Sequence, residues 1–187
     1  MAVLARLSLL AAALVLGGME FLTPAHADET IQLHEQEIKA GLLYNFLKYV
    51  DWPDNHAAAP MTVCVFGGDP FNGYLQPIAG RTVNQRKITI REIRDLPETS
   101  ACDLLFINAA QKDHWPQMQK FLSGKTVLTV SDFSQFTDNG GMIEFGRKDD
   151  HINVSLNIDA VTAAQLRIED RLLKLVTITH SRADEGR

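Results

Sequence analysis

The sequence predicts an α/β domain with a mostly parallel sheet, helices on both faces and an antiparallel hairpin near the carboxyl end. Three observations support this fold class. Short apolar runs alternate with helix-like segments, a glycine turn follows the first run at once, and two late runs are separated only by a charged turn. With 187 residues and 45% apolar content, the chain is long enough for one core, so we expect a single domain over residues 28–187.

The first 27 residues have the features of a cleavable signal peptide. Arg6 precedes an uncharged apolar run at 7–16, and Ala25-His26-Ala27 has the small-x-small pattern of a cleavage site. The run is too short for a stable membrane anchor, although an uncleaved anchor is the alternative. We therefore expect a periplasmic protein without direct membrane insertion. The net charge of −5, with scattered basic residues, argues against a nucleic-acid partner.

Residues 28–36 are expected to be an irregular polar lead-in, and residues 37–50 a helix. Apolar side chains recur there at spacings of three and four, in two adjacent stripes. So wide an apolar surface predicts a helix that is buried against a sheet or shared with a partner molecule. Trp52 and Pro53 end the helix, because a residue before proline avoids the helical region.

The stretch at 62–71 predicts the opening of a βαβ unit. An apolar strand at 62–66 is followed by Gly67-Gly68 and then by Asp69-Pro70, a helix cap and a residue suited to the first helical turn. We expect a short helix at 71–78. The glycines lack the spacing of a dinucleotide or phosphate-binding loop, so a tight turn with a cap is the better interpretation.

Three further strands and one helix follow. We expect strands at 87–93, 102–107 and 126–130, and a helix at 113–122 with Pro116 in its first turn. Charged residues alternate along 87–93, which is typical of a strand near a sheet edge. Numbered along the chain from 62–66, the four strands are expected in the order 2-1-3-4.

The last third of the chain predicts a hairpin and a helix. The runs at 141–145 and 151–158 are too close in sequence to pair other than antiparallel. Residues 160–179 are expected to be largely helical.

The two cysteines, Cys64 and Cys102, both lie at strand-like runs. In an exported domain two cysteines favour a disulfide over a metal pair or a nucleophile. A redox switch and two buried free thiols remain alternatives.

Several motifs in order resemble the YfiR family of periplasmic proteins. They run from GLLYNFLKYVDWP at 41–53, through VCVFG at 63–67, DPF at 69–71, CDLLFI at 102–107, VLTVSD at 127–132 and GGMI at 140–143, to LLKL at 172–175. The family's cysteines in its first and third strands match Cys64 and Cys102. Gln165 departs from the pattern, which favours glycine there, as do Glu169-Asp170, where small hydroxyl residues are favoured.

The resemblance implies a regulator and not an enzyme. Members of this family repress an inner-membrane diguanylate cyclase by engaging its periplasmic sensory part, which lowers cyclic-di-GMP and biofilm formation. An outer-membrane lipoprotein can sequester them, and they tend to form homodimers. No cofactor is implied. The motif residues at the end of the first helix are candidates for core or interface: Leu43, Tyr44, Asn45, Phe46, Trp52 and Pro53.

The competing class is a periplasmic small-molecule-binding protein that feeds a sensor kinase or transporter. Open α/β sheets hold ligands at the carboxyl ends of their strands. The candidate crevice residues there are Gly67, Gly68, Asn108, Ser131 and Asp132. The histidines lack ligand spacing, which argues against a metal site, and no nucleophile motif appears, so catalytic residues are not expected.

Overall fold

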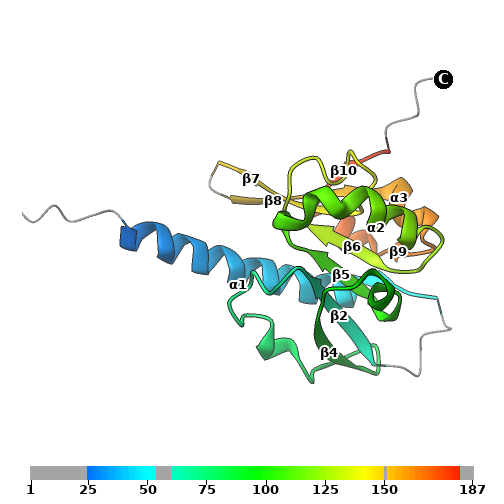
Figure 1. The fold of residues 1–187 in the computed structure, drawn as a ribbon, viewed down its shortest axis with the longest axis horizontal. Helices are drawn as coiled ribbons and strands as arrows, with labels where there is room; N and C mark the ends of the chain where they lie inside the picture. Colours follow the sequence, from blue (N-terminus) through cyan, green and yellow to red (C-terminus); the bar gives the residue numbers. More distant parts are fainter. Residues whose placement is uncertain (1–24, 54–59, 150, 182–187) are drawn as a thin grey trace, which may run out of the picture.

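The structure is a computed structural model that describes residues 25–53, 60–149 and 151–181. It contains one eight-stranded sheet in the order β10-β8-β7-β6-β5-β2-β4-β3, and a separate pair, β1-β9 (Figure 1). The strands are β1 (Val50–Asp51), β2 (Met61–Phe66), β3 (Thr82–Val83), β4 (Arg86–Ile93), β5 (Leu104–Ile107), β6 (Leu128–Ser131), β7 (Ile143–Lys148), β8 (His151–Asn157), β9 (Arg167–Ile168) and β10 (Thr177–Thr179). The α-helices are α1 (Ala25–Tyr49), α2 (Trp115–Leu122), α3 (Ile158–Ala163) and α4 (Asp170–Leu173).

The centre of the sheet confirms the predicted order. β2 pairs in parallel with β4 on one side and with β5 on the other, and β5 pairs in parallel with β6. The late hairpin is also confirmed, since β7 and β8 pair antiparallel. β7 joins β6 in parallel, and the hairpin thereby extends the sheet instead of lying apart from it.

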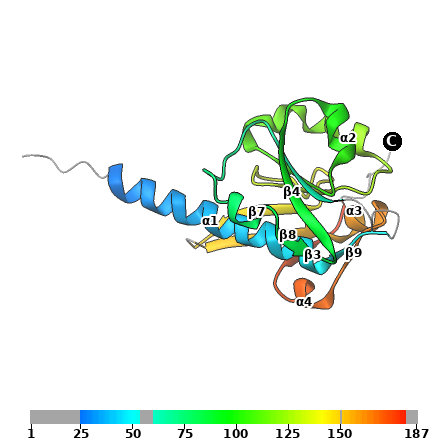
Figure 2. The ribbon, with the colours of Figure 1, turned by 90° about the horizontal axis from the view of Figure 1, so that it is seen from below.

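Alternate residues of the central strands enter two separate cores. Val63 and Val65 of β2 belong to a cluster with α1, whereas Cys64 and Phe66 belong to a second cluster with α2. The period-two alternation of strands thus buries β2 on both faces, which explains its nearly continuous apolar run. Figure 2 shows α1 and α2 on opposite sides of β4.

The first helix is longer than predicted. The polar segment at 28–36, expected to be irregular, continues as helix within α1. This half of α1 projects beyond the sheet in both views (Figures 1 and 2). The predicted signal segment, 1–27, lies outside the described residues except for its last three, which begin α1.

The segment expected to be a helix at 71–78 forms turns and a short 3-10 helix, η2 (Gln76–Ile78). Asn72 and Gly73 both have positive φ, at 49° and 84°, which an α-helix does not allow. Asp69 accepts hydrogen bonds from the backbone N–H groups of Phe71 and Gly73, at 2.7 and 3.2 Å, so it stabilises a turn. Two further 3-10 helices are η3 (Leu96–Ala101) and η4 (Ala109–His114), and η4 precedes α2.

The prediction of a helix over 160–179 is wrong. α3 ends at Ala163, Gln165 follows with φ of 61°, and the rest forms β9, α4 and β10. β9 pairs with β1 next to the end of α1, and β10 adds to the sheet beside β8. The run Val176-Thr177-Ile178-Thr179 is rich in β-branched residues, which favour a strand once a partner strand is available.

Candidate interaction surface, disulfide and strand-end crevice

The motif residues of α1 divide between core and surface. Leu43 and Phe46 are fully buried, and the Phe46 ring stacks on Phe145 with centroids 5.9 Å apart. Tyr44 and Asn45, on a neighbouring strip of α1, are only partly buried. The motif therefore packs the helix on the sheet and also leaves polar and aromatic groups facing outward.

Tyr44 is the centre of a patch that we call the α1 patch, which consists of the partly buried Tyr44 and Tyr49 and the exposed Lys48 and Arg81. The Lys48 ammonium lies 5.6 Å from the Tyr44 ring centroid and 5.1 Å from that of Tyr49. The Arg81 guanidinium lies 5.5 Å from the Tyr44 ring. Cations over aromatic rings are attracted by the ring quadrupole, which favours this arrangement of the four side chains. Tyrosine and arginine are also enriched at protein interfaces.

A buried ammonium fixes the base of the projecting half of α1. Lys39 is 5% exposed and lies 2.8 Å from Glu35 on the same helix and 2.9 Å from Asp132, which follows β6. Arg147 of β7 lies 3.4 Å from Glu35. Burial lowers the pKa of Lys39, but hydrogen bonds to Glu35 and Asp132 outweigh it and raise that pKa above its ordinary value.

Trp52 supports a buried ion pair. Its indole N–H donates to the backbone oxygen of Asp103 at 3.2 Å. The Asp103 carboxylate lies 2.8 Å from the guanidinium of Arg86 and accepts the backbone N–H of Thr62 at 2.7 Å. Both charged side chains are nearly inaccessible. Through Asp103, Trp52 therefore links the segment after β1 to β2 and β4, and both Trp52 and Pro53 are partly buried.

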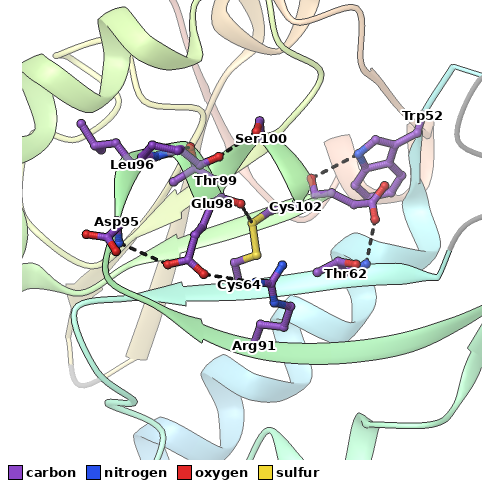
Figure 3. The surroundings of a disulfide bond; sticks show 12 residues. Trp52, Thr62, Cys64, Arg91, Asp95, Leu96, Glu98, Thr99, Ser100 and Cys102 are labelled. Carbon is purple, nitrogen blue, oxygen red and sulfur yellow. Dashed lines mark hydrogen bonds and ion pairs between the residues drawn. A yellow bond between two sulfur atoms is a disulfide. The ribbon is translucent and has the colours of Figure 1, made fainter.

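The structure contains the expected disulfide between Cys64 and Cys102, whose Cα atoms are 5.8 Å apart. It ties the middle of β2 to the residue that ends η3, and both cysteines are at most 2% exposed. Figure 3 shows Glu98 of η3 between Arg91 and Asp95, with the disulfide beside it. The bond lies in the second core, among side chains of α2, so a reductant reaches it only if this side of the domain opens.

The five crevice candidates do not form one site. Gly67, Gly68 and Asn108 come together, and the Asn108 amide contacts the Gly68 oxygen at 3.5 Å. Ser131 is buried, and its hydroxyl donates to Ile107 at 2.7 Å. Asp132 is bound to Lys39. Ser131 and Asp132 therefore make structural contacts. Their partners, Ile107 and Lys39, lie elsewhere in the chain, so the sequence pattern could not reveal these contacts.

The described residues include neither a membrane-spanning helix nor a cluster of metal ligands. No described helix combines the length and apolar character needed to cross a membrane. Within the same residues, no group of three or more His, Cys, Asp or Glu side chains could hold a metal ion.

Comparisons with known proteins identify the family. No curated protein matches the chain. Among solved structures, the ABC domain in complex with L-Trp from Streptococcus pneumonia is similar at 7% identity and a TM-score of 0.45, over 64% of this chain and 55% of that one, a likeness too low to carry an argument. The model of the YfiR/HmsC-like family matches residues 36–177. This match spans α1 to β10, so the chain belongs to the YfiR/HmsC-like family.

Proposed function

We propose that this protein is a periplasmic repressor that binds the periplasmic sensory region of an inner-membrane diguanylate cyclase and so lowers cyclic-di-GMP signalling and biofilm formation. The observation that carries the proposal is the family match over residues 36–177, because the YfiR/HmsC-like family is one of periplasmic regulators of this pathway. The disulfide is consistent with an oxidising compartment.

The α1 patch is the surface we assign to the cyclase. It combines two tyrosine rings with two cations, and it lies on the helix that carries the family motif. Side chains that such contacts already restrain lose less entropy on binding than unrestrained ones. The exposed cations favour a partner segment with acidic residues, since complementary charges speed encounter and select partners.

Repression then follows from a difference in affinity. A repressor that binds one conformation of the cyclase more tightly than the other shifts the cyclase toward that conformation, by no more than the difference in binding free energy. A few kcal/mol are enough to change a mostly active population into a mostly inactive one. Sequestration by an outer-membrane lipoprotein would relieve repression if the lipoprotein covers the same patch. We also propose a homodimer, which would present two such patches.

The test is capture of the cyclase from solubilised inner membrane, together with a cyclic-di-GMP reporter in cells. Lys48→Glu reverses the charge of the patch and is expected to weaken capture about tenfold or more and to raise cyclic-di-GMP. Lys120→Glu, at an exposed position of α2 on the other face of the sheet, is the matched control and should leave both unchanged. The assignment of the patch fails if the two variants behave alike. The function fails if the unmodified protein captures no diguanylate cyclase and its deletion leaves cyclic-di-GMP unchanged.

A second candidate, a small-molecule-binding protein, has one specific observation in its favour. A hollow lies at the carboxyl ends of β2 and β4, next to Gly67 and Gly68. This is the edge of a parallel sheet where ligands are commonly bound.

A further inference from the structure

The hollow at the carboxyl ends of β2 and β4 has a volume of about 530 Å³. Its wall includes Gly67, Gly68, Arg94, Asp95, Gln111 and His114. The size falls within the range of small-molecule sites in proteins. These residues come from three segments of the chain, at 67–68, 94–95 and 111–114, and the strand order brings them to one edge.

The two glycines shape one side of the hollow. Gly67 and Gly68 have φ of 91° and 90°, values that residues other than glycine rarely adopt. The Gly67 N–H donates to the Ile93 oxygen at 3.4 Å, so the loop after β2 turns toward the end of β4. Gln111 packs directly over Gly67, whereas nothing lies within 4 Å of the position that a Cβ on Gly68 would take. Gly68 therefore borders open space.

Several side chains around this space can donate hydrogen bonds. Arg94 supplies a guanidinium, which binds phosphate and carboxylate groups in a bidentate manner. His114 supplies an imidazole, and Gln111 an amide. Asp95 is the acidic residue of the wall, and it is the N-cap residue of η3, with its backbone N–H donating to Glu98 at 3.4 Å. Arg94 and Asp95 carry opposite formal charges, so it is the planar, multiply donating guanidinium of Arg94, and not a net positive charge, that suits an anion.

We propose that this hollow binds a small anion with phosphate or carboxylate groups, held by Arg94 and His114. The site is separate from the α1 patch in its residues, and it requires no protein partner. It therefore goes beyond the repressor function and would give the protein an input from a periplasmic metabolite. Asp95 also lines this hollow, so its negative charge limits the affinity for an anion.

The experiment is an NMR titration of the full-length mature protein with inorganic phosphate and, separately, citrate, at constant ionic strength. We expect saturable shifts of the Gly67 and Gly68 amides with at least one of the two anions below about 50 mM. Arg94→Gln should weaken binding about tenfold, since a charge-assisted hydrogen-bonded contact is lost. Asp95→Asn keeps a capping side chain and should strengthen binding about threefold, because it removes a nearby like charge.

Arg167→Gln is the control, because Arg167 is an exposed arginine of β9 outside the hollow. It should bind like the unmodified protein. A saturable response to phosphate alone or to citrate alone identifies the anionic group that the site prefers. The proposal is overturned if neither anion gives saturable shifts, if Arg94→Gln binds as well as the control, or if Asp95→Asn weakens binding. The amide spectrum of each variant verifies its fold.

Discussion

Loss of the Cys64–Cys102 disulfide is expected to lower the free energy of unfolding by about 4 kcal/mol. The bond closes a loop with a sequence separation of 38, and the estimate follows from the entropy that such a loop removes from the unfolded chain. A domain of ordinary stability has a free energy of unfolding of roughly 5–15 kcal/mol. The reduced protein should therefore retain its fold but with a much larger unfolded fraction.

The assay is urea unfolding of the oxidised protein and of protein refolded in reductant, followed by tryptophan fluorescence. Trp115 packs in the same core as the disulfide and against Phe136, with ring centroids 4.6 Å apart, so its signal reports on this core. Cys64→Ala with Cys102→Ala should be at least as unstable as the reduced protein. Alanine is preferred to serine because a buried hydroxyl without a partner adds its own cost.

A difference below about 1 kcal/mol between oxidised and reduced protein would refute the loop-entropy reasoning. The same double variant tests redox regulation in cells. If reduction relieves repression by loosening the fold, the variant should raise cyclic-di-GMP in proportion to its unfolded fraction. Unchanged repression at normal protein levels would remove the redox hypothesis and leave the bond as a structural staple.

Three further predictions concern buried charge and backbone strain. Lys39→Met should lower the free energy of unfolding by about 2–3 kcal/mol, because Asp132 and Glu35 both lose the buried ammonium, although Glu35 keeps its contact with Arg147. Although burial opposes it, hydrogen bonding raises the pKa of Lys39 above 10.5. The stability that the charged Lys39 contributes should therefore be complete below about pH 10.5 and be lost as the pH rises through the raised pKa. In urea unfolding at about pH 8 and pH 11, the unmodified protein should lose more free energy of unfolding between the two pH values than Lys39→Met does. Arg86→Met should lower the free energy of unfolding by about 3–5 kcal/mol. Adding Asp103→Leu should restore part of that free energy, and a double-mutant cycle measures the coupling between the two residues. Gln165→Gly should stabilise the domain by about 0.5–1 kcal/mol, because glycine adopts φ of 61° without strain, and a lower melting temperature would contradict this.

The buried strands were predictable because their signal is local. A strand covered on both faces must be apolar at nearly every position, and the runs containing Cys64 and Leu105 meet this condition. The hairpin was predictable because a short turn between β7 and β8 leaves only antiparallel pairing.

The C-terminal region was not predictable in the same way. Ile168 is in a strand because it pairs with Val50, more than a hundred residues earlier in the chain. Ile178 is in a strand because it pairs with Leu156 of β8. The apolar residues Leu172, Leu173, Leu175 and Val176 are also compatible with one face of a helix, and pairing with existing strands outweighed that preference. The positive φ of Gln165 had a sequence signal only through the resemblance, which favours glycine at that position.

The sequence by itself determined the parallel core, the disulfide partners and the family, because each depends on residue type and order along the chain. Tertiary structure alone decided that Lys39 binds Asp132, that Ser131 is used inside the core, and that Arg94 and His114 face one hollow. Those contacts join residues from different strands and loops. Their positions are fixed only when the sheet has formed, since the register between strands places each side chain relative to the others.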